Sequence, residues 1–438
     1  MAADMSDIRD IKKRGGDIIG LLGLFILTVL AAYVTVALKS AVKLSEPVPL
    51  PHTGLSVSIP VGNGWHSEKR WMYHNHAFIL SSVFVLRPGK ATAWTHCQYR
   101  WGAKKADPQD RFAWKASEVD GEIVETGRAQ AEGLTVDWAR IERPDFLLTT
   151  FWGTAGLPCG RQLDIEVHQI MSDPELSKRI FNRILENLSF KENPLLEAGA
   201  EVVTMMKNEG LDSDLDHRNR RTLYLIKDST GRPIGFTMDV LGDSGRDPQW
   251  NVQGAGFLYL GGQNDYEQET LFKCSENLDE FVYLRKFDST QETSSTEIIL
   301  EASGALTVRK SGRQTDVRKY YPGAAALPDV FFDHIFRQVL DSDKREIAVD
   351  LIEASGKIVP TYISRVEADP SEAAYVFDLE FLDDPGVSQR VFLNDQKKIF
   401  RSLIQQENLY ILERTSAEVI AREFPEYAQR ILPGRQTL

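Results

Sequence analysis

Two histidines in the first quarter of the chain have the spacing of metal ligands. His74 and His76 stand two residues apart on a predicted strand, so both imidazoles would project from the same face. His66 and Glu68 are close enough in sequence to join them. No third ligand follows at a spacing known for metal sites, and the neighbouring aromatic residues fit a surface patch equally well. We therefore expect no metal cofactor; His74, His76 and His66 are the residues on which a metal site would be built.

A serine and a histidine farther along the chain have the types needed for nucleophilic catalysis. Gly242–Gly245 reads GDSG, which resembles the nucleophile signature of chymotrypsin-like proteases, and His96 lies in a THC segment similar to their histidine motif. The resemblance implies that Ser244 attacks the substrate and His96 acts as general base. Two departures from the protease pattern oppose this resemblance. Arg246 stands where a glycine is required, and no convincing orienting aspartate lies between the two motifs, Asp137 being the best available. The GDSG segment is also ordinary turn sequence, so we expect no enzyme and keep a serine hydrolase as an alternative.

The chain carries neither a phosphate-binding loop nor a basic surface pattern. No GxxxxGKS or GxxxxGKT segment occurs, and the glycines between 254 and 262 lead into a predicted strand, not into a helix. The formal net charge is −12 and the isoelectric point is near 5.3. Phosphate backbones are bound by clustered lysine and arginine. We therefore expect no nucleotide cofactor and no nucleic-acid partner.

All of these residues follow one long apolar run at the start of the chain. Ile18–Leu38 contains no charged residue and, as a helix, is roughly 31 Å long, enough to cross a hydrocarbon core of about 30 Å once. Four basic residues precede it closely and two follow it, so residues 1–17 are expected to stay in the cytoplasm. We expect a single-pass membrane protein whose bulk lies on the extracytoplasmic, periplasmic side. A cleaved signal peptide is the alternative, but the run is longer than usual and no A-x-A site follows.

Three cysteines bear on the redox state of the exported part. In an oxidising compartment Cys97 and Cys159 could form a disulfide and leave Cys274 unpaired. Equally, all three could be small buried apolar residues. The sequence leaves both alternatives open.

Changes in sequence character divide the exported part into two domains. Residues 39–52 are rich in proline and predict an extended stalk. Residues 53–193 carry short apolar stretches typical of strands. They also contain two helix starts, at Asp107-Pro108 and Asp173-Pro174, where an N-cap carboxylate precedes a first-turn proline. Residues 194–221 predict a connector with one short helix.

Residues 222–438 predict a second domain built on a large curved antiparallel sheet with few helices. Candidate strands follow one another closely from Thr222, and Tyr375–Phe381 alternates strictly, with one strongly apolar face. A helix with a wide apolar stripe at Pro328–Leu340 interrupts the strands, and a last helix opens with a capping box from Thr415 to Glu418. The expected fold class of the exported part is therefore α+β, preceded by a single transmembrane helix.

Two stretches of the chain resemble known families. The segment GLSVSIPVGNGW and the helix SKRIFNRILENLSF resemble the PsbP-like family of small α/β domains over roughly residues 50–192. The serial hairpins, the helix DVFFDHIFRQVL and the segment GKIVPTYI are similar to the LolA-like lipoprotein carriers over about residues 222–430. The resemblances imply binding, through an apolar cavity beneath a curved sheet in one and a protein-docking surface in the other. Neither family has a fixed catalytic set to transfer.

Together these observations predict a membrane-anchored accessory protein without catalytic activity. We expect a subunit or assembly factor of an envelope membrane complex, which binds a protein partner in or beside the membrane. The alternative is a carrier of a lipid or another apolar ligand, held in a cavity lined by Phe332, Phe336 and Phe377. Tethering suits either role, because it raises the effective concentration of a binding domain near membrane-bound partners.

Overall fold

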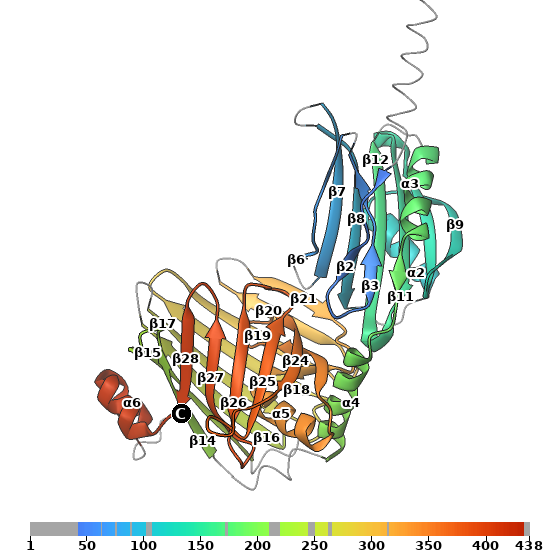
Figure 1. Ribbon diagram of the computed structural model, residues 1–438. Coiled ribbons are helices and arrows are strands. Elements are labelled where there is room, and N and C mark those ends of the chain that lie inside the picture. The colour runs from blue at the N-terminus through green and yellow to red at the C-terminus, as the bar shows by residue number, and fades with distance from the viewer. Residues whose placement is uncertain are drawn as a thin grey trace, which may run out of the picture.

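The computed structural model shows two β-rich units joined by helix α4 (Pro194–Glu209), as Figure 1 shows. It describes residues 43–62, 64–74, 77–87, 90–101, 107–170, 174–209, 220–243, 250–261, 265–312 and 315–432. The coarse part of the expected fold, a large antiparallel sheet with few helices, is confirmed: the described chain is mostly β, with six α-helices, one eight-stranded sheet and one fifteen-stranded sheet. Ile18–Leu38 lies outside the described residues, among which no helix is long and apolar enough to cross a membrane.

The first unit is built on an antiparallel sheet with strand order β5-β7-β8-β12-β11-β10-β9, and β6 pairs with β7. Its strands are β5 (Trp65–Ser67), β6 (Met72–His74), β7 (Ala77–Arg87), β8 (Lys90–Trp101), β9 (Glu122–Ala131), β10 (Leu134–Arg143), β11 (Leu148–Gly156) and β12 (Arg161–Ile170). Two small sheets flank it, formed by β1 (Lys43–Leu44) with β4 (Pro60–Val61), and by β2 (Val48–Leu50) and β13 (Ser189–Phe190) with β3 (Leu55–Val57).

Helices α2 (Pro108–Glu118) and α3 (Pro174–Glu186) cover opposite faces of this sheet. Phe181 of α3 packs against Phe151 of β11, with ring centroids 5.8 Å apart. Phe112 of α2 packs instead against Trp152, the next residue along the same strand. Neighbouring residues of a strand point to opposite faces, so β11 supplies core contacts to both helices.

The start of α2 follows the sequence prediction. Asp107 is the N-cap residue, and its side chain accepts a hydrogen bond from the backbone N–H of Gln109 at 2.9 Å. Pro108 opens the first turn, where a missing N–H costs nothing. The N-cap predicted at Asp173 lies outside the described residues, although α3 does begin at Pro174.

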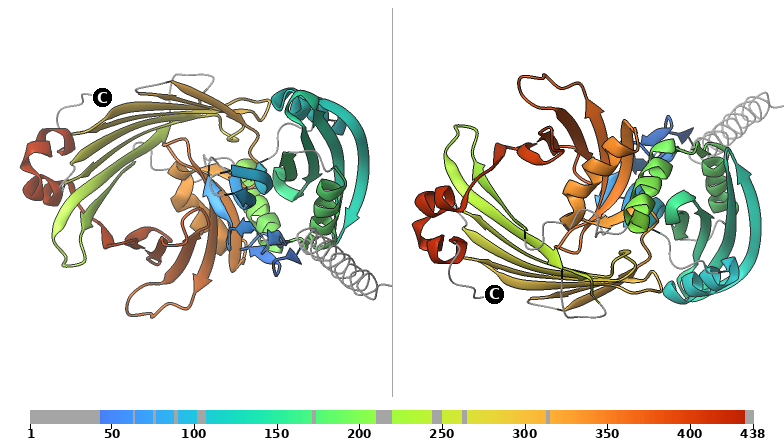
Figure 2. Two further views of the ribbon diagram at one scale, coloured as in Figure 1. Left: turned by 90° about the horizontal axis from the view of Figure 1, so that it is seen from above. Right: turned by 90° about the horizontal axis from the view of Figure 1, so that it is seen from below.

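The second unit is a single sheet of fifteen strands that curves until its two arms face each other, as Figure 2 shows. Strands β14 to β21 form one arm and β22 to β28 the other, and β14 pairs with β28 between them. All neighbouring strands are antiparallel except β22 and β23, which are parallel. The first arm contains β14 (Arg220–Lys227), β15 (Pro233–Asp243), β16 (Val252–Leu260), β17 (Tyr266–Cys274), β18 (Phe281–Ser289), β19 (Thr293–Leu300), β20 (Leu306–Ser311) and β21 (Asp316–Tyr320). The second arm contains β22 (Ala326–Pro328), β23 (Glu346–Ile352), β24 (Ile358–Val366), β25 (Tyr375–Phe381), β26 (Ser388–Leu393), β27 (Ile399–Gln405) and β28 (Leu409–Arg414).

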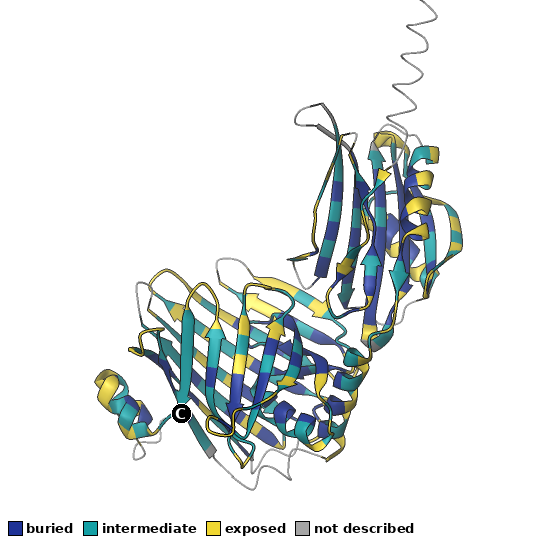
Figure 3. Ribbon diagram, viewed as in Figure 1, coloured by how far each residue is buried: buried dark blue, intermediate teal, exposed yellow. Residues whose placement is uncertain are grey.

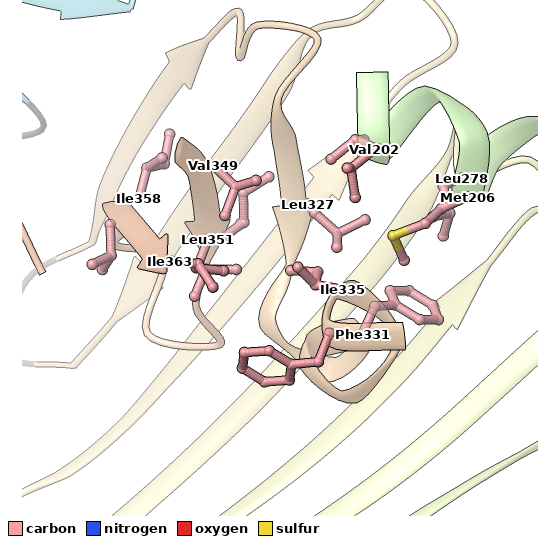
Figure 4. Close-up of a cluster of buried hydrophobic side chains, with 14 of the residues drawn as sticks. Val202, Met206, Leu278, Leu327, Phe331, Ile335, Val349, Leu351, Ile358 and Ile363 are labelled. Carbon is pink, nitrogen blue, oxygen red and sulfur yellow. The ribbon is translucent and has the colours of Figure 1, made fainter. Parts of the chain in front are cut away.

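The core of the second unit lies between the arms, around the short 3₁₀ turn η4 (Asp329–Phe331) and helix α5 (Phe332–Asp341). Figure 4 shows Val202 and Met206 of α4 beside Leu327, Phe331 and Ile335. Burial alternates along many of the strands, as Figure 3 shows. The predicted connector is therefore in part a core helix, because α4 contributes buried side chains of its own.

The C-terminal helices α6 (Ala417–Glu423) and α7 (Ala428–Ile431), with η5 (Pro425–Tyr427) between them, cover the outer face of β14–β16. There Phe236 packs against Phe424, with ring centroids 5.4 Å apart. The predicted capping box is wrong: Ser416 is the N-cap residue and its side chain makes no capping bond. Thr415 continues the sheet instead, and its N–H donates to the carbonyl oxygen of Leu223 at 2.9 Å.

A buried ion pair joins the two units. Arg161 of the first unit pairs with Asp350 of the second, and both side chains are only 2% exposed. Trp101 donates from its indole nitrogen to Asp350 at 2.8 Å, and the Tyr73 hydroxyl donates to the carbonyl oxygen of Ile358. A charge buried at an interface is stable only with its partner in place, so these contacts hold the units together.

The sheet register excludes a disulfide between Cys97 and Cys159. Cys97 is a free, fully buried thiol on β8, where it lies opposite Ile165 of β12. β12 begins at Arg161, about 13 Å along the strand from Ile165, and Cys159 precedes it in the 3₁₀ turn η2 (Pro158–Gly160), whereas bridged cysteines have Cα atoms less than about 7 Å apart. Cys274 is also a free buried thiol.

Candidate ligand-binding cavity

A cavity of about 680 Å³ lies between the two arms of the curved sheet. Strands β14 to β18 line it on one side and β23 to β28 on the other, while η4 and α5 border it from the core. Its size falls within the range of small-molecule sites, about 300–1,000 Å³. Apolar and aromatic residues form much of its lining, among them Tyr224, Leu258, Tyr266, Phe332 and Leu412.

The alternation of residues on β15 and β16 brings polar groups to this cavity. Phe236, Met238 and Phe257 are buried on the outer face, beneath the C-terminal helices. Their neighbours point inward, and Asp239 pairs in register with Gly256 on the inner side. A Cβ atom at Gly256 would stand 2.8 Å from the Asp239 carboxylate. Glycine therefore leaves open the space beside this acid.

Asp329 carries an unpartnered carboxylate oxygen inside the cavity wall. Its side chain accepts hydrogen bonds from the Tyr283 hydroxyl and the Ala354 backbone N–H, but its Oδ1 atom is buried without a hydrogen-bond partner among the described residues. Burial and the nearby carboxylates of Glu353 and Asp239 raise the pKa of Asp329 to about 7. Because this oxygen is itself covered, a ligand would gain by bringing a positive charge into the cavity beside it, not by bonding to it directly.

Three further carboxylates line the cavity with it, and we call Asp239, Asp329, Asp333 and Glu353 the acidic wall. Enclosure between the arms and repulsion from Asp333 raise the pKa of Asp239 to about 6, although the residue is exposed to the open cavity and the Thr237 hydroxyl donates to it at 3.1 Å. Burial also raises the pKa of Glu353. Neighbouring carboxylates that raise one another's pKa values stabilise a cation placed between them.

Basic side chains also line the cavity: Arg337 lies on α5, one turn after Asp333, while Lys398 precedes β27 and Arg414 ends β28. Strand register separates Arg414 from the acidic wall: it lies opposite Tyr224 on β14, whereas Asp239 lies opposite Thr222. Two strands and two residues apart, the Cα atoms of the two residues are about 12 Å from each other. Arg414 is also not among the groups that shift the pKa of Asp239.

The three phenylalanines predicted to line a cavity take different positions. Phe332 lies on the cavity wall. Phe336 and Phe377 are fully buried in the core, with ring centroids 4.9 Å apart, and do not line the cavity. The expectation is corrected for these two residues, because the side of α5 that carries Phe336 faces the packed core.

The geometry does not support the predicted serine-hydrolase set. Ser244 lies outside the described residues. His96 pairs in register with Glu166, and burial lowers the pKa of its imidazole. Asp137 stands on β10, three strands away from the β8 strand of His96, and accepts a hydrogen bond from Arg128 at 2.7 Å. Asp137 therefore cannot orient His96.

The histidines predicted for a metal site are also far apart where the structure describes them. His66 on β5 lies opposite Val83 of β7, and His74 on β6 lies opposite Ala77 of the same strand. Val83 and Ala77 are six residues apart on β7, so His66 and His74 are separated by about 20 Å along the sheet edge. His76 lies outside the described residues, and within the described ranges no group of three or more metal-ligating side chains occurs.

The sequence did not reveal a buried polar cluster in the first unit. The His168 ring lies between the Thr150 hydroxyl, 2.8 Å from Nδ1, and the Glu166 carboxylate beside Nε2. Lys115 of α2 pairs with Glu166 at 2.9 Å. Thr150, His168 and Lys115 are buried, and the cluster links α2 to β11 and β12. The sequence feature that could have predicted this cluster is the two-residue spacing of Glu166 and His168, which puts both side chains on one face of the strand.

These features define a mostly β protein of two units, with its candidate site between the arms of a curved sheet. No protein-family model matches the chain, and no curated protein does. A solved structure of a β-barrel-like protein from Brucella abortus, a domain of unknown function called DUF1849, is distantly similar. The two share 11% sequence identity and a TM-score of 0.34, over 44% of this chain and 95% of that chain.

Proposed function

We propose that the chain is a membrane-anchored, non-catalytic binding protein whose second unit holds an amphipathic ligand with a positively charged end. The cavity of about 680 Å³, in which apolar residues surround the acidic wall, carries this proposal. An apolar lining suits the body of such a ligand. The cost of burying carboxylates is offset when the polar end brings the opposite charge.

The anchor belongs to the same proposal. Ile18–Leu38 would cross the membrane once, leaving residues 1–17 in the cytoplasm and both units on the periplasmic side. The proposal also keeps the resemblance of the first unit to PsbP-like domains and of the second to LolA-like half-barrels. The presence of a cavity favours the ligand carrier over the complex subunit or assembly factor, because a subunit needs no such space.

The experiment compares two probes in the full chain, purified in a mild detergent. A long-chain alkylamine and the carboxylic acid of the same chain length are titrated, and bound probe is counted by native mass spectrometry. We expect the amine to bind in preference to the acid. Leu258→Trp, which fills the cavity from β16, should abolish binding. Gln253→Trp is the matched control, because Gln253 is exposed on the outer side of the same strand.

Three results would contradict the proposal in whole or in part. If neither probe binds and no small molecule copurifies with the wild-type chain, the cavity is not a binding site for amphiphiles. If L258W binds the amine as well as wild type does, the probe sits elsewhere. Equal binding of amine and acid would leave an apolar-ligand site but refute the charge class assigned to it.

A further inference from the structure

The turn between β10 and β11 exposes two large apolar side chains at one end of the first unit. It consists of η1 (Pro144–Phe146) followed by Leu147. Phe146 is 60% exposed and Leu147 59% exposed. Ile123 and Val124 on the adjacent edge strand β9 are also exposed. Single exposed apolar residues are common, but a group of them at one tip indicates a contact surface.

The backbone of this turn is held in a form that disfavours leucine. Leu147 has φ 50° and ψ 38°, the left-handed region that glycine or asparagine occupies at lower cost. A residue that is both strained and exposed gains nothing from packing, so its side chain is retained for something outside the fold. Arg143 lies over the Phe146 ring at 3.9 Å and pairs with Asp120 at 2.9 Å.

Strand register places this tip at the end of the sheet where the described chain begins. One row of paired residues crosses the sheet just before the tip: Trp65, Phe84, Ala93, Gln169, Thr149 and Glu142. Trp65 is bridged to Gly62, and Lys43 pairs with Val61. Lys43 and the turn at Phe146 are thus at the same end of the unit.

The short segment between the apolar run and Lys43 limits how far this end of the first unit can lie from the membrane. Only five Cα–Cα steps separate Leu38, the last residue of the apolar run, from Lys43. Even fully extended, five steps reach only about 17 Å. If Ile18–Leu38 spans a membrane, this end of the first unit must lie close to the bilayer surface.

We propose that the β10–β11 turn is a membrane-contact surface, with Phe146 and Leu147 inserted among the lipids beside the anchor. This inference rests on the proposed anchor and is independent of the proposed ligand cavity. Asp145 within the turn and Asp120 beside it carry negative charge. The contact is therefore apolar insertion, not attraction to anionic headgroups, and it should not require anionic lipid.

The test measures the depth of a spin label in the full chain reconstituted into vesicles. Phe146→Cys is labelled with a nitroxide in a Cys159→Ser chain, where the remaining thiols Cys97 and Cys274 are buried. We expect the label to lose accessibility to a water-soluble nickel complex and to gain accessibility to oxygen. This should hold in vesicles of phosphatidylcholine, with or without phosphatidylglycerol. Glu132→Cys is the control, because Glu132 is exposed in the β9–β10 turn at the opposite end of the sheet.

Three outcomes would overturn the inference. A Phe146 label as accessible to nickel as the Glu132 label places the tip in water. Spin–spin broadening between copies identifies a self-association surface instead. A chain that does not float with the vesicles removes the anchor on which the argument depends. Leu147→Gly separates folding from contact: it should keep or raise the melting temperature, while the Phe146 label in that background becomes more accessible to nickel.

Discussion

Replacing Asp329 with asparagine tests the acidic wall while leaving the shape of the cavity unchanged. The pKa of this carboxyl rises from 3.8 to about 7, chiefly through burial. The folded chain therefore holds the proton more tightly than the unfolded chain, and the free energy of unfolding falls as pH rises from about 4 to about 7. At 1.36 kcal/mol per pH unit the whole difference is ~4 kcal/mol.

The free energy of unfolding of the D329N chain should not show this fall between about pH 4 and about pH 7, because asparagine does not ionise. At about pH 8 we expect it to be more stable than wild type by up to ~4 kcal/mol, whereas at about pH 4 the two should differ little. The amide oxygen can accept the bonds from Tyr283 and Ala354, and the amide nitrogen then takes the place of the unpartnered Oδ1. The same change should weaken binding of the alkylamine, so stability and binding move in opposite directions.

Urea unfolding followed by circular dichroism at both pH values measures this difference. Asp395→Asn, at an exposed position in the turn between β26 and β27, is the matched control and should change stability alike at both. If D329N lowers stability equally at low and high pH, the carboxylate is a structural acceptor, and the proposed cost of its charge is refuted. A gain in stability that persists at about pH 4 would also contradict the reasoning, because the proton already neutralises the acid there.

Three further substitutions test the contacts that hold the units in shape. Glu166→Gln should destabilise the chain by ~1–3 kcal/mol at neutral pH. Although burial opposes the shift, the neighbouring imidazole and ammonium groups lower the pKa of Glu166 to about 2. The difference in stability between E166Q and wild type should therefore shrink below about pH 4.5, which acid unfolding measures. Asp350→Asn leaves Arg161 buried without its counter-charge, which should cost ~3–5 kcal/mol and increase proteolysis between the units. Gly199→Ala gains ~1 kcal/mol of helix propensity, yet its Cβ would stand 1.9 Å from the Ala348 carbonyl oxygen, so the melting temperature should fall.

Local signals in the sequence predicted several elements of the fold. The Asp107-Pro108 pair gave the start of α2, because an N-cap carboxylate and a first-turn proline act within a few residues. The apolar stripe after Pro328 predicted α5 for the same reason. The capping box at Thr415 failed because a distant strand decided the matter: the Thr415 N–H pairs with Leu223, which no local pattern shows.

The residues of the cavity were harder to predict than the elements that carry them. Phe332 and Phe336 belong to one apolar stripe, and only the packing of α5 between the arms separates a cavity wall from a core position. Asp239 is the only acid within the mostly apolar stretch Ile234–Leu241 of β15, and such a residue could face water on either side of a sheet. Its inward direction follows only once the C-terminal helices are seen to cover Phe236 and Phe257 on the outer face.

The carboxylates of Asp350 and Asp329 differ in whether another group of the chain compensates their charge. Asp350 forms an ion pair with the Arg161 guanidinium and accepts a hydrogen bond from the Trp101 indole. Asp329 has two donors on one side and an unpartnered oxygen on the other, at the wall of a cavity. Burial disfavours the charge of both groups, but only the first is compensated by a counter-charge from within the chain. A cation that arrives from outside would stabilise the ionised form of an uncompensated acid at a cavity wall, and this is the basis of our proposal that the cavity binds an amine-bearing amphiphile.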